Sequence, residues 1–96
     1  MVPIRRIKPS TELAAFLRSL PPAIKRKVRG GLDALLKNPY EGKPLRAELT
    51  GLWSLRVGRF RIIYRWHESV LDVLAIGPRE SIYPTALERF HKLPEK

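Results

Sequence analysis

The sequence contains no cysteine, which excludes a disulfide framework and any chemistry that depends on a thiolate. It has no apolar run near the roughly 18 residues that a membrane-spanning helix needs. Its first ten residues, MVPIRRIKPS, lack the apolar stretch of a signal peptide. Its two histidines, His67 and His91, are far apart and do not have metal-ligand spacing. We therefore expect a soluble cytoplasmic protein that uses neither a metal nor a cofactor.

Acidic residues are also scarce. Nine Asp and Glu face nineteen Lys and Arg, which gives a net charge of +10 and a pI near 10.7. A surface with this excess of positive charge attracts polyanions such as nucleic acid, an anionic membrane or an acidic protein partner. Because the expected protein has no membrane segment, we favour nucleic acid and an acidic protein partner.

The length of 96 residues predicts a single domain over residues 1–96, because such a chain buries roughly two-thirds of its unfolded surface around one core. Apolar residues recur at helical spacing in residues 13–20 and again in residues 24–36. Ser10 is a candidate N-cap for the first helix, and Pro21 and Pro22 separate the two. The pattern predicts an antiparallel helical hairpin, in which Gly30 and Gly31 indicate close packing or a bend.

After Pro44 the apolar period changes from 3.6 to 2, which is the period of β-strands. Short links between these strands predict an antiparallel meander, and its apolar face needs the helical hairpin as a cover. The fold class is therefore α+β, in the order β-α-α-β-β-β-α. The predicted strands are residues 2–8, 52–58, 59–66 and 70–77, the last buried on both faces, and a short C-terminal helix covers residues 83–92.

One predicted strand, RFRIIYRW, carries an unusual amount of positive charge. Its aromatic and apolar side chains share one face, and Arg59, Arg61 and Arg65 share the opposite face with Ile63. No acidic residue occurs in residues 52–67, so these arginines lack local partners. We expect the aromatic face to pack on the helices and the arginine face to meet solvent or a cleft.

The motif IGPRESIY follows the buried strand. Its Gly-Pro pair ends the strand, and a helical turn would put Arg79 and Tyr83 on one side, where Arg61 could join them. Arginine offers a planar fork that matches phosphate oxygens. RNA supplies its own nucleophile, the 2′-OH, so its cleavage needs charge neutralisation and proton transfer but no metal. Arginines could neutralise the charge, and surrounding cations would favour the phenolate of Tyr83 as a base.

The stretch PLRAELTGLWSLRVGRFRIIYRWHESVLDVLAIGPRESIY resembles the RelE/ParE toxin superfamily of bacterial and archaeal toxin–antitoxin systems. The shared pattern is an aromatic-x-hydrophobic-Arg strand, a Gly, an aromatic-Arg-hydrophobic-hydrophobic-Tyr strand, a buried strand and an Arg-x-x-x-Tyr segment. The resemblance implies a RelE-like fold and a metal-independent endoribonuclease that cuts mRNA in the ribosomal A site. ParE-like members inhibit DNA gyrase instead, without acting as enzymes.

The resemblance also implies site residues. Arg61, Arg79 and Tyr83 match RelE-type catalytic positions, and Arg56 stands where a basic strand residue is common. Arg46 and Arg59 are expected to contact RNA phosphates. Two departures concern the general acid, because Pro78 replaces a His or other basic residue of many relatives and Ser54 replaces a Lys of some.

Three functions remain open at this point: an mRNA interferase toxin, a toxin that binds gyrase, and an RNA-binding module that uses charge alone. The set of Arg61, Arg79 and Tyr83 favours the first, and the lack of stacking aromatics on the polar sheet face disfavours the third. The implied partners are the ribosome with its mRNA and a cognate antitoxin with an acidic binding segment, which forms a hetero-oligomer with the toxin.

Overall fold

The computed structural model describes residues 6–9 and 11–92 of the chain. The candidate N-cap Ser10 and the first half of the predicted strand 2–8 therefore lie outside the described residues. The order of strands and α-helices matches the predicted order, with short 3-10 turns and a two-residue strand added between α2 and β3. The elements are β1 (Arg6–Pro9), α1 (Thr11–Ser19), α2 (Pro22–Lys37), η1 (Pro39–Glu41), β2 (Lys43–Pro44), η2 (Ala47–Leu49), β3 (Trp53–Val57), β4 (Phe60–His67), β5 (Val70–Pro78) and α3 (Arg79–His91).

The strands form one five-stranded sheet in the order β1-β5-β4-β3-β2. Strands β2 to β5 pair antiparallel, which confirms the predicted meander and the α+β class. Strand β1 adds a parallel edge to β5, a pairing that the local sequence pattern did not specify. Within the described part of the chain, no helix is long and apolar enough to cross a membrane.

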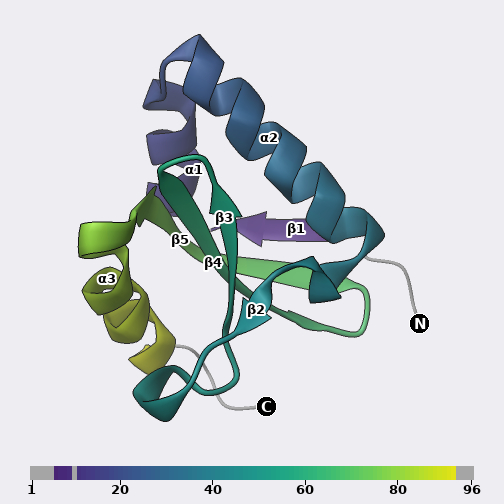
Figure 1. Ribbon diagram of the computed structural model, residues 1–96, viewed down its shortest axis with the longest axis vertical. Coiled ribbons are helices and arrows are strands. Elements are labelled where there is room, and N and C mark those ends of the chain that lie inside the picture. Colours follow the sequence, from purple (N-terminus) through teal and green to yellow (C-terminus); the bar gives the residue numbers. More distant parts are fainter. Residues whose placement is uncertain (1–5, 10, 93–96) are drawn as a thin grey trace.

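Helices cover both faces of the sheet, with α1 and α2 on one side and α3 on the other (Figure 1). Leu13, Val28 and Leu35 of the helical hairpin pack on Ile62 and other aromatic and apolar side chains of the sheet, as predicted. The second core lies under α3 and was not predicted, because the arginine face of β4 was expected to meet only solvent or a cleft. It consists of Leu52, Ile63, Leu74, Ala75, Ile82 and Ala86.

An irregularity in the β4–β5 pairing makes the second core possible. The register shifts between Ile63 and Tyr64, so that Ile63 faces Ala75 while Tyr64 faces Val73. Leu74 is the extra residue of the bulge, and it joins Ala75 in the core under α3. The backbone oxygen of Leu74 accepts a hydrogen bond of 2.7 Å from the guanidinium of Arg89 on α3, which fixes the helix against the bulge. Strand β5 is therefore buried on both faces, as predicted.

Helix α2 packs closely against the sheet at one of its two glycines. A Cβ added to Gly31 would lie 2.8 Å from Cγ2 of Val57 on β3, whereas a Cβ added to Gly30 meets nothing within 4 Å. The helix runs without interruption over Pro22–Lys37, and the contact at Gly31 confirms close packing, one of the two predicted alternatives.

Candidate functional site

The predicted arginines gather at the end of the sheet where the β3–β4 hairpin meets the start of α3. A cavity of about 420 Å³ opens there. It is lined by Arg56, Gly58, Arg59, Phe60, Arg61, Pro78, Arg79 and Glu80. Four guanidinium groups from β3, the hairpin turn, β4 and α3 thus surround one volume of the size of a small ligand site.

The register of the sheet sets this arrangement. Arg56 of β3 is the direct partner of Arg61 on β4, and Arg61 is the partner of Gly77 on β5. Strand β5 ends at Pro78, and Arg79 begins α3 directly after it. Like charges directly opposite on neighbouring strands destabilise a sheet. An anion bound between these arginines would offset that cost.

The hairpin turn brings a further cation to the cavity. Val57 pairs with Phe60, so Gly58 and Arg59 form a two-residue loop. Gly58 has a φ of +61°, a conformation that two-residue hairpin loops favour and that glycine adopts without strain. The carbonyl of Gly58 accepts a hydrogen bond of 3.4 Å from Nε of Arg56, which directs that side chain along the turn.

Arg65 does not belong to this site, although it shares the arginine face of β4. Its Nε lies 3.5 Å from a carboxylate oxygen of Asp72, its partner on β5. Arg65 has no acidic partner in residues 52–67, as predicted, and its partner comes instead from the next strand, β5. Arg61, Arg56, Arg59 and Arg79 form no ion pair with an acid among the residues that the structure describes.

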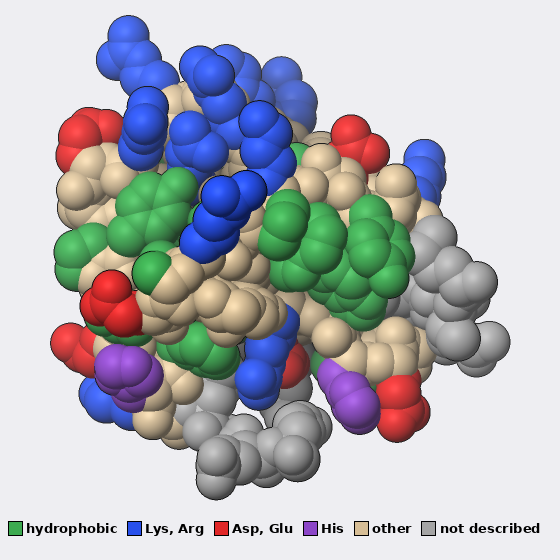
Figure 2. All heavy atoms as spheres, turned by 60° about the horizontal axis from the view of Figure 1, so that its bottom comes forward, with side chains coloured by type: hydrophobic (Ala, Val, Ile, Leu, Met, Phe, Trp, Pro, Cys, Tyr) green, Lys and Arg blue, Asp and Glu red, His purple; other side chains and the backbone are tan. Residues whose placement is uncertain are grey.

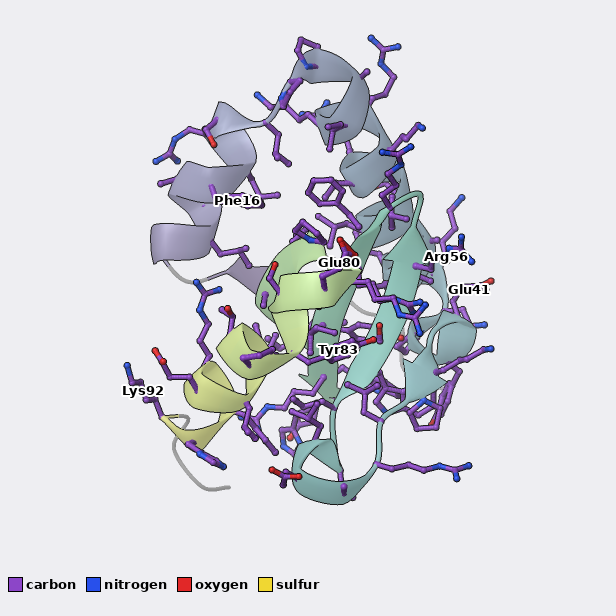
Figure 3. All side chains as sticks on the ribbon, turned by 60° about the vertical axis from the view of Figure 1, so that its left-hand side comes forward. Phe16, Glu41, Arg56, Glu80, Tyr83 and Lys92 are labelled. Atoms are coloured by element: carbon purple, nitrogen blue, oxygen red, sulfur yellow. The ribbon has the colours of Figure 1, made fainter. Side chains whose placement is uncertain are left out.

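Tyr83 and Arg46, which were also predicted for the site, do not line the cavity. Tyr83 is half-buried and packs against the second core together with Leu45 and Leu49. Because α3 begins at Arg79, Tyr83 lies one helical turn beyond the cavity, on the same helix (Figure 3). Arg46 is exposed and precedes η2, in the loop that connects β2 to β3.

Glu80 lines the cavity and was not predicted as a site residue. It is the second residue of α3 and is exposed, and Figure 3 labels it together with Arg56 and Tyr83. Its position in the sequence directly after Arg79 was the available signal. The sequence pattern did not place the start of α3 at Arg79, so it could not show that Glu80 would line the cavity.

The charge on the surface is uneven. On the face of the molecule drawn in Figure 2, Lys and Arg side chains gather along the upper edge, whereas Asp and Glu side chains lie singly. In the described part of the chain, no group of three or more His, Cys, Asp or Glu side chains could hold a metal ion. The chemistry that this surface offers is recognition of anions by arginine.

A family model described as ParE toxin of type II toxin-antitoxin system, parDE, matches residues 6–83. Among curated proteins, the chain is 37% identical over 71 residues to Toxin RelG from Mycobacterium tuberculosis. The aligned region covers 70% of this chain and 82% of that protein.

Solved structures give the same result. The toxin–antitoxin complex RelBE2 from Mycobacterium tuberculosis matches with a TM-score of 0.70 and 34% identity, over 82% of this chain and 94% of the matched one. An archaeal RelE–RelB complex from Pyrococcus horikoshii OT3 matches with a TM-score of 0.63 and 29% identity, over 84% and 99%. A mutant of the E. coli toxin RelE in the free state, at 18% identity and a TM-score of 0.74 over 98% and 100%, shares the fold.

Proposed function

Because this chain belongs to the RelE/ParE superfamily of toxins of type II toxin–antitoxin systems, we propose that it is a RelE-like endoribonuclease that cleaves mRNA on the ribosome. Cleavage proceeds by attack of the RNA 2′-OH on the adjacent phosphorus and requires no metal. Translation stops because the message is cut.

The observation that carries this proposal is the cavity lined by four arginines, which come from β3, the hairpin turn, β4 and α3. A phosphorane develops negative charge on its oxygens as the 2′-oxygen attacks. Guanidinium groups that the fold already holds around one volume stabilise that charge with little reorganisation. The pairing of Arg56 with Arg61 makes sense in this role, because a bound phosphate removes the repulsion between them.

Each arginine has a role that follows from its position. Arg61 is half-buried on β4 and holds the scissile phosphate from a rigid strand. Arg79, at the start of α3, stabilises the phosphorane or the leaving 5′-oxygen. Arg56 completes the catalytic set beside Arg61, and Arg59 contacts a neighbouring phosphate from the hairpin turn.

Tyr83 and Arg46 act beyond the cavity. A half-buried ring one helical turn from Arg79 can stack on a base that enters beside the cavity. Arg46, exposed before η2, contacts the RNA backbone. Proton transfer by Tyr83 was also predicted, but packing against the second core favours the stacking role.

Two partners belong to this proposal. The ribosome with its mRNA is attracted by the net charge of +10. The second partner is a cognate antitoxin with an acidic binding segment, which forms a hetero-oligomer with this chain in the cytoplasm. Toxin–antitoxin complexes among the matched structures support this partner.

Single-turnover cleavage of mRNA on purified ribosomes tests the proposal. Arg61→Ala and Arg79→Ala should each slow cleavage by on the order of 10²-fold or more, as expected for the loss of one transition-state donor. Arg65→Ala is the matched control, because it removes the same charge from the same strand but lies outside the cavity. Cleavage should persist in EDTA, provided that enough magnesium is added to keep the ribosomes intact. The magnesium concentration is varied in a separate series.

Wild-type rates for folded Arg61→Ala and Arg79→Ala variants would contradict the site. A loss of cleavage on removal of a metal other than the magnesium that keeps the ribosomes intact would contradict the mechanism.

A second candidate function follows from the family model, which is that of ParE toxins. In that case the chain inhibits DNA gyrase by binding it and is not an enzyme. A supercoiling assay with purified gyrase separates the two functions. Inhibition of gyrase by a toxin that leaves ribosome-bound mRNA intact would favour this alternative.

A further inference from the structure

The arginine cavity contains one side chain that can accept a proton. Arginine keeps its proton under all ordinary conditions, so Arg56, Arg59, Arg61 and Arg79 can stabilise charge but cannot act as bases. The remaining lining residues Gly58, Phe60 and Pro78 carry no proton-exchanging group. Glu80 is the exception among the lining residues, and it has no ion-pair partner in the described part of the chain.

We propose that Glu80 is the general base of the cleavage reaction and takes the proton of the attacking 2′-OH. This inference rests on the endoribonuclease function proposed above and adds a catalytic residue to it. Glu80 directly follows Arg79, and both residues line the cavity from the first turn of α3. Arg56 of β3, Arg59 of the hairpin turn and Arg61 of β4 line the same cavity from the other elements.

Tyr83, the base expected from the sequence, is less suited to this step. Its ring packs against the second core and does not line the cavity. A base must lie within hydrogen-bonding reach of the proton that it removes. If the arginines hold the phosphate inside the cavity, Glu80 belongs to the lining that surrounds it and Tyr83 does not.

The step balances without a further reactant. The 2′-oxygen forms a bond to phosphorus while its proton passes to the Glu80 carboxylate. The bond from phosphorus to the 5′-oxygen then breaks, and its electron pair stays on that oxygen, which takes a proton from water. Glu80 returns its proton to the hydroxide so formed. The products are a 2′,3′-cyclic phosphate and a free 5′-hydroxyl.

A structural role must be separated from this catalytic one. An acidic side chain in the first turn of a helix also stabilises the helix through its dipole. That role would change the stability of the protein but not the pH dependence of cleavage. A readout based on pH therefore distinguishes the two roles.

The experiment compares Glu80→Gln with wild type in single-turnover mRNA cleavage on ribosomes across a pH series. We expect a rate loss on the order of 10²-fold or more and disappearance of the acidic limb of the pH–rate profile. Affinity for ribosomes should not fall, because the variant removes a negative charge from a cationic surface. Glu88→Gln is the matched control, since Glu88 lies on α3 outside the cavity and pairs with Lys92 at 3.5 Å.

Two further measurements keep the assignment open to refutation. Glu80→Asp retains a carboxylate and should keep the acidic limb with an intermediate rate, which also covers the case in which Glu80→Gln does not fold. A substrate with sulfur in place of the leaving 5′-oxygen needs no general acid. If the Glu80→Gln variant cleaved that substrate at the wild-type rate, Glu80 would act as a general acid, and its assignment as the base would be overturned.

The remaining outcomes separate this inference from the proposed function. Wild-type rate and pH profile in folded Glu80→Gln would overturn the role of Glu80 while leaving the endoribonuclease in place. Absence of cleavage by the wild-type protein on ribosomes would overturn the proposed function and this inference with it.

Discussion

Replacing Tyr64 by Phe should destabilise the protein although it removes a single oxygen atom. Tyr64 lies in the core at the centre of β4 and is fully buried. Its hydroxyl donates a hydrogen bond of 2.6 Å to the carbonyl of Pro39 and accepts one of 3.2 Å from the backbone N–H of Gly42. These two bonds attach η1 and the approach to β2 to the sheet.

The magnitude follows from what the substitution leaves behind. Phenylalanine fills the same space, so no cavity forms, but the carbonyl of Pro39 and the N–H of Gly42 lose a partner. Leaving buried polar groups unsatisfied costs about 1–3 kcal/mol. For a domain of this size, each kcal/mol lowers Tm by roughly 4–8 °C.

The pH dependence tests a different property of the same hydroxyl, namely that burial disfavours its ionised form. Burial raises the pKa of Tyr64 from 10.0 to about 12, with a smaller rise from the charge of Glu41 and an opposing effect of the hydrogen bond from Gly42. Because the pKa is higher in the folded state, the stabilisation is fully present below pH 10 and is lost as the pH rises to about 12. Each pKa unit corresponds to about 1.4 kcal/mol, so the whole effect amounts to at most about 3 kcal/mol.

Denaturant unfolding at pH 7 and at pH 11 measures both effects. The difference in unfolding free energy between wild type and Tyr64→Phe should be about 1–3 kcal/mol at pH 7 and clearly smaller at pH 11. Tyr40→Phe is the matched control, because Tyr40 is 56% exposed, and its change should stay within about 0.5 kcal/mol. Equal stabilities of wild type and Tyr64→Phe at pH 7, or a difference that does not change between the two pH values, would refute the reasoning.

Two other substitutions test the packing of the sheet. Gly31→Ala should destabilise the protein, because the new methyl group would collide with β3, whereas Gly30→Ala, with open space around it, should stabilise it by up to about 1 kcal/mol in the same denaturant assay. The reverse order would contradict the close packing of α2 on β3. Ser54→Ala should be neutral or stabilising, because the buried hydroxyl of Ser54 has no hydrogen-bond partner among the described residues. A loss above about 1 kcal/mol in thermal unfolding would indicate a partner for this hydroxyl.

The sequence was sufficient for the fold class and for most of the candidate site. Periodicities of 3.6 and 2 depend on local geometry, so they located the helical hairpin, the meander and the cationic face of β4. The IGPRESIY motif located the end of β5, and Arg56, Arg59, Arg61 and Arg79 indeed line one cavity. The two-residue hairpin loop sets Arg56 opposite Arg61, so these side chains share one face of the sheet.

The tertiary structure decided the features that depend on contacts distant in sequence. Arg65 is neutralised by Asp72, because the β4–β5 register sets these residues opposite each other. Tyr83 packs against the second core and Glu80 lines the cavity, because α3 begins at Arg79 and crosses the bulged face of β5. Local periodicity determines which side of its own element a residue occupies. The element that covers that side is determined by pairing and packing between segments far apart in the chain.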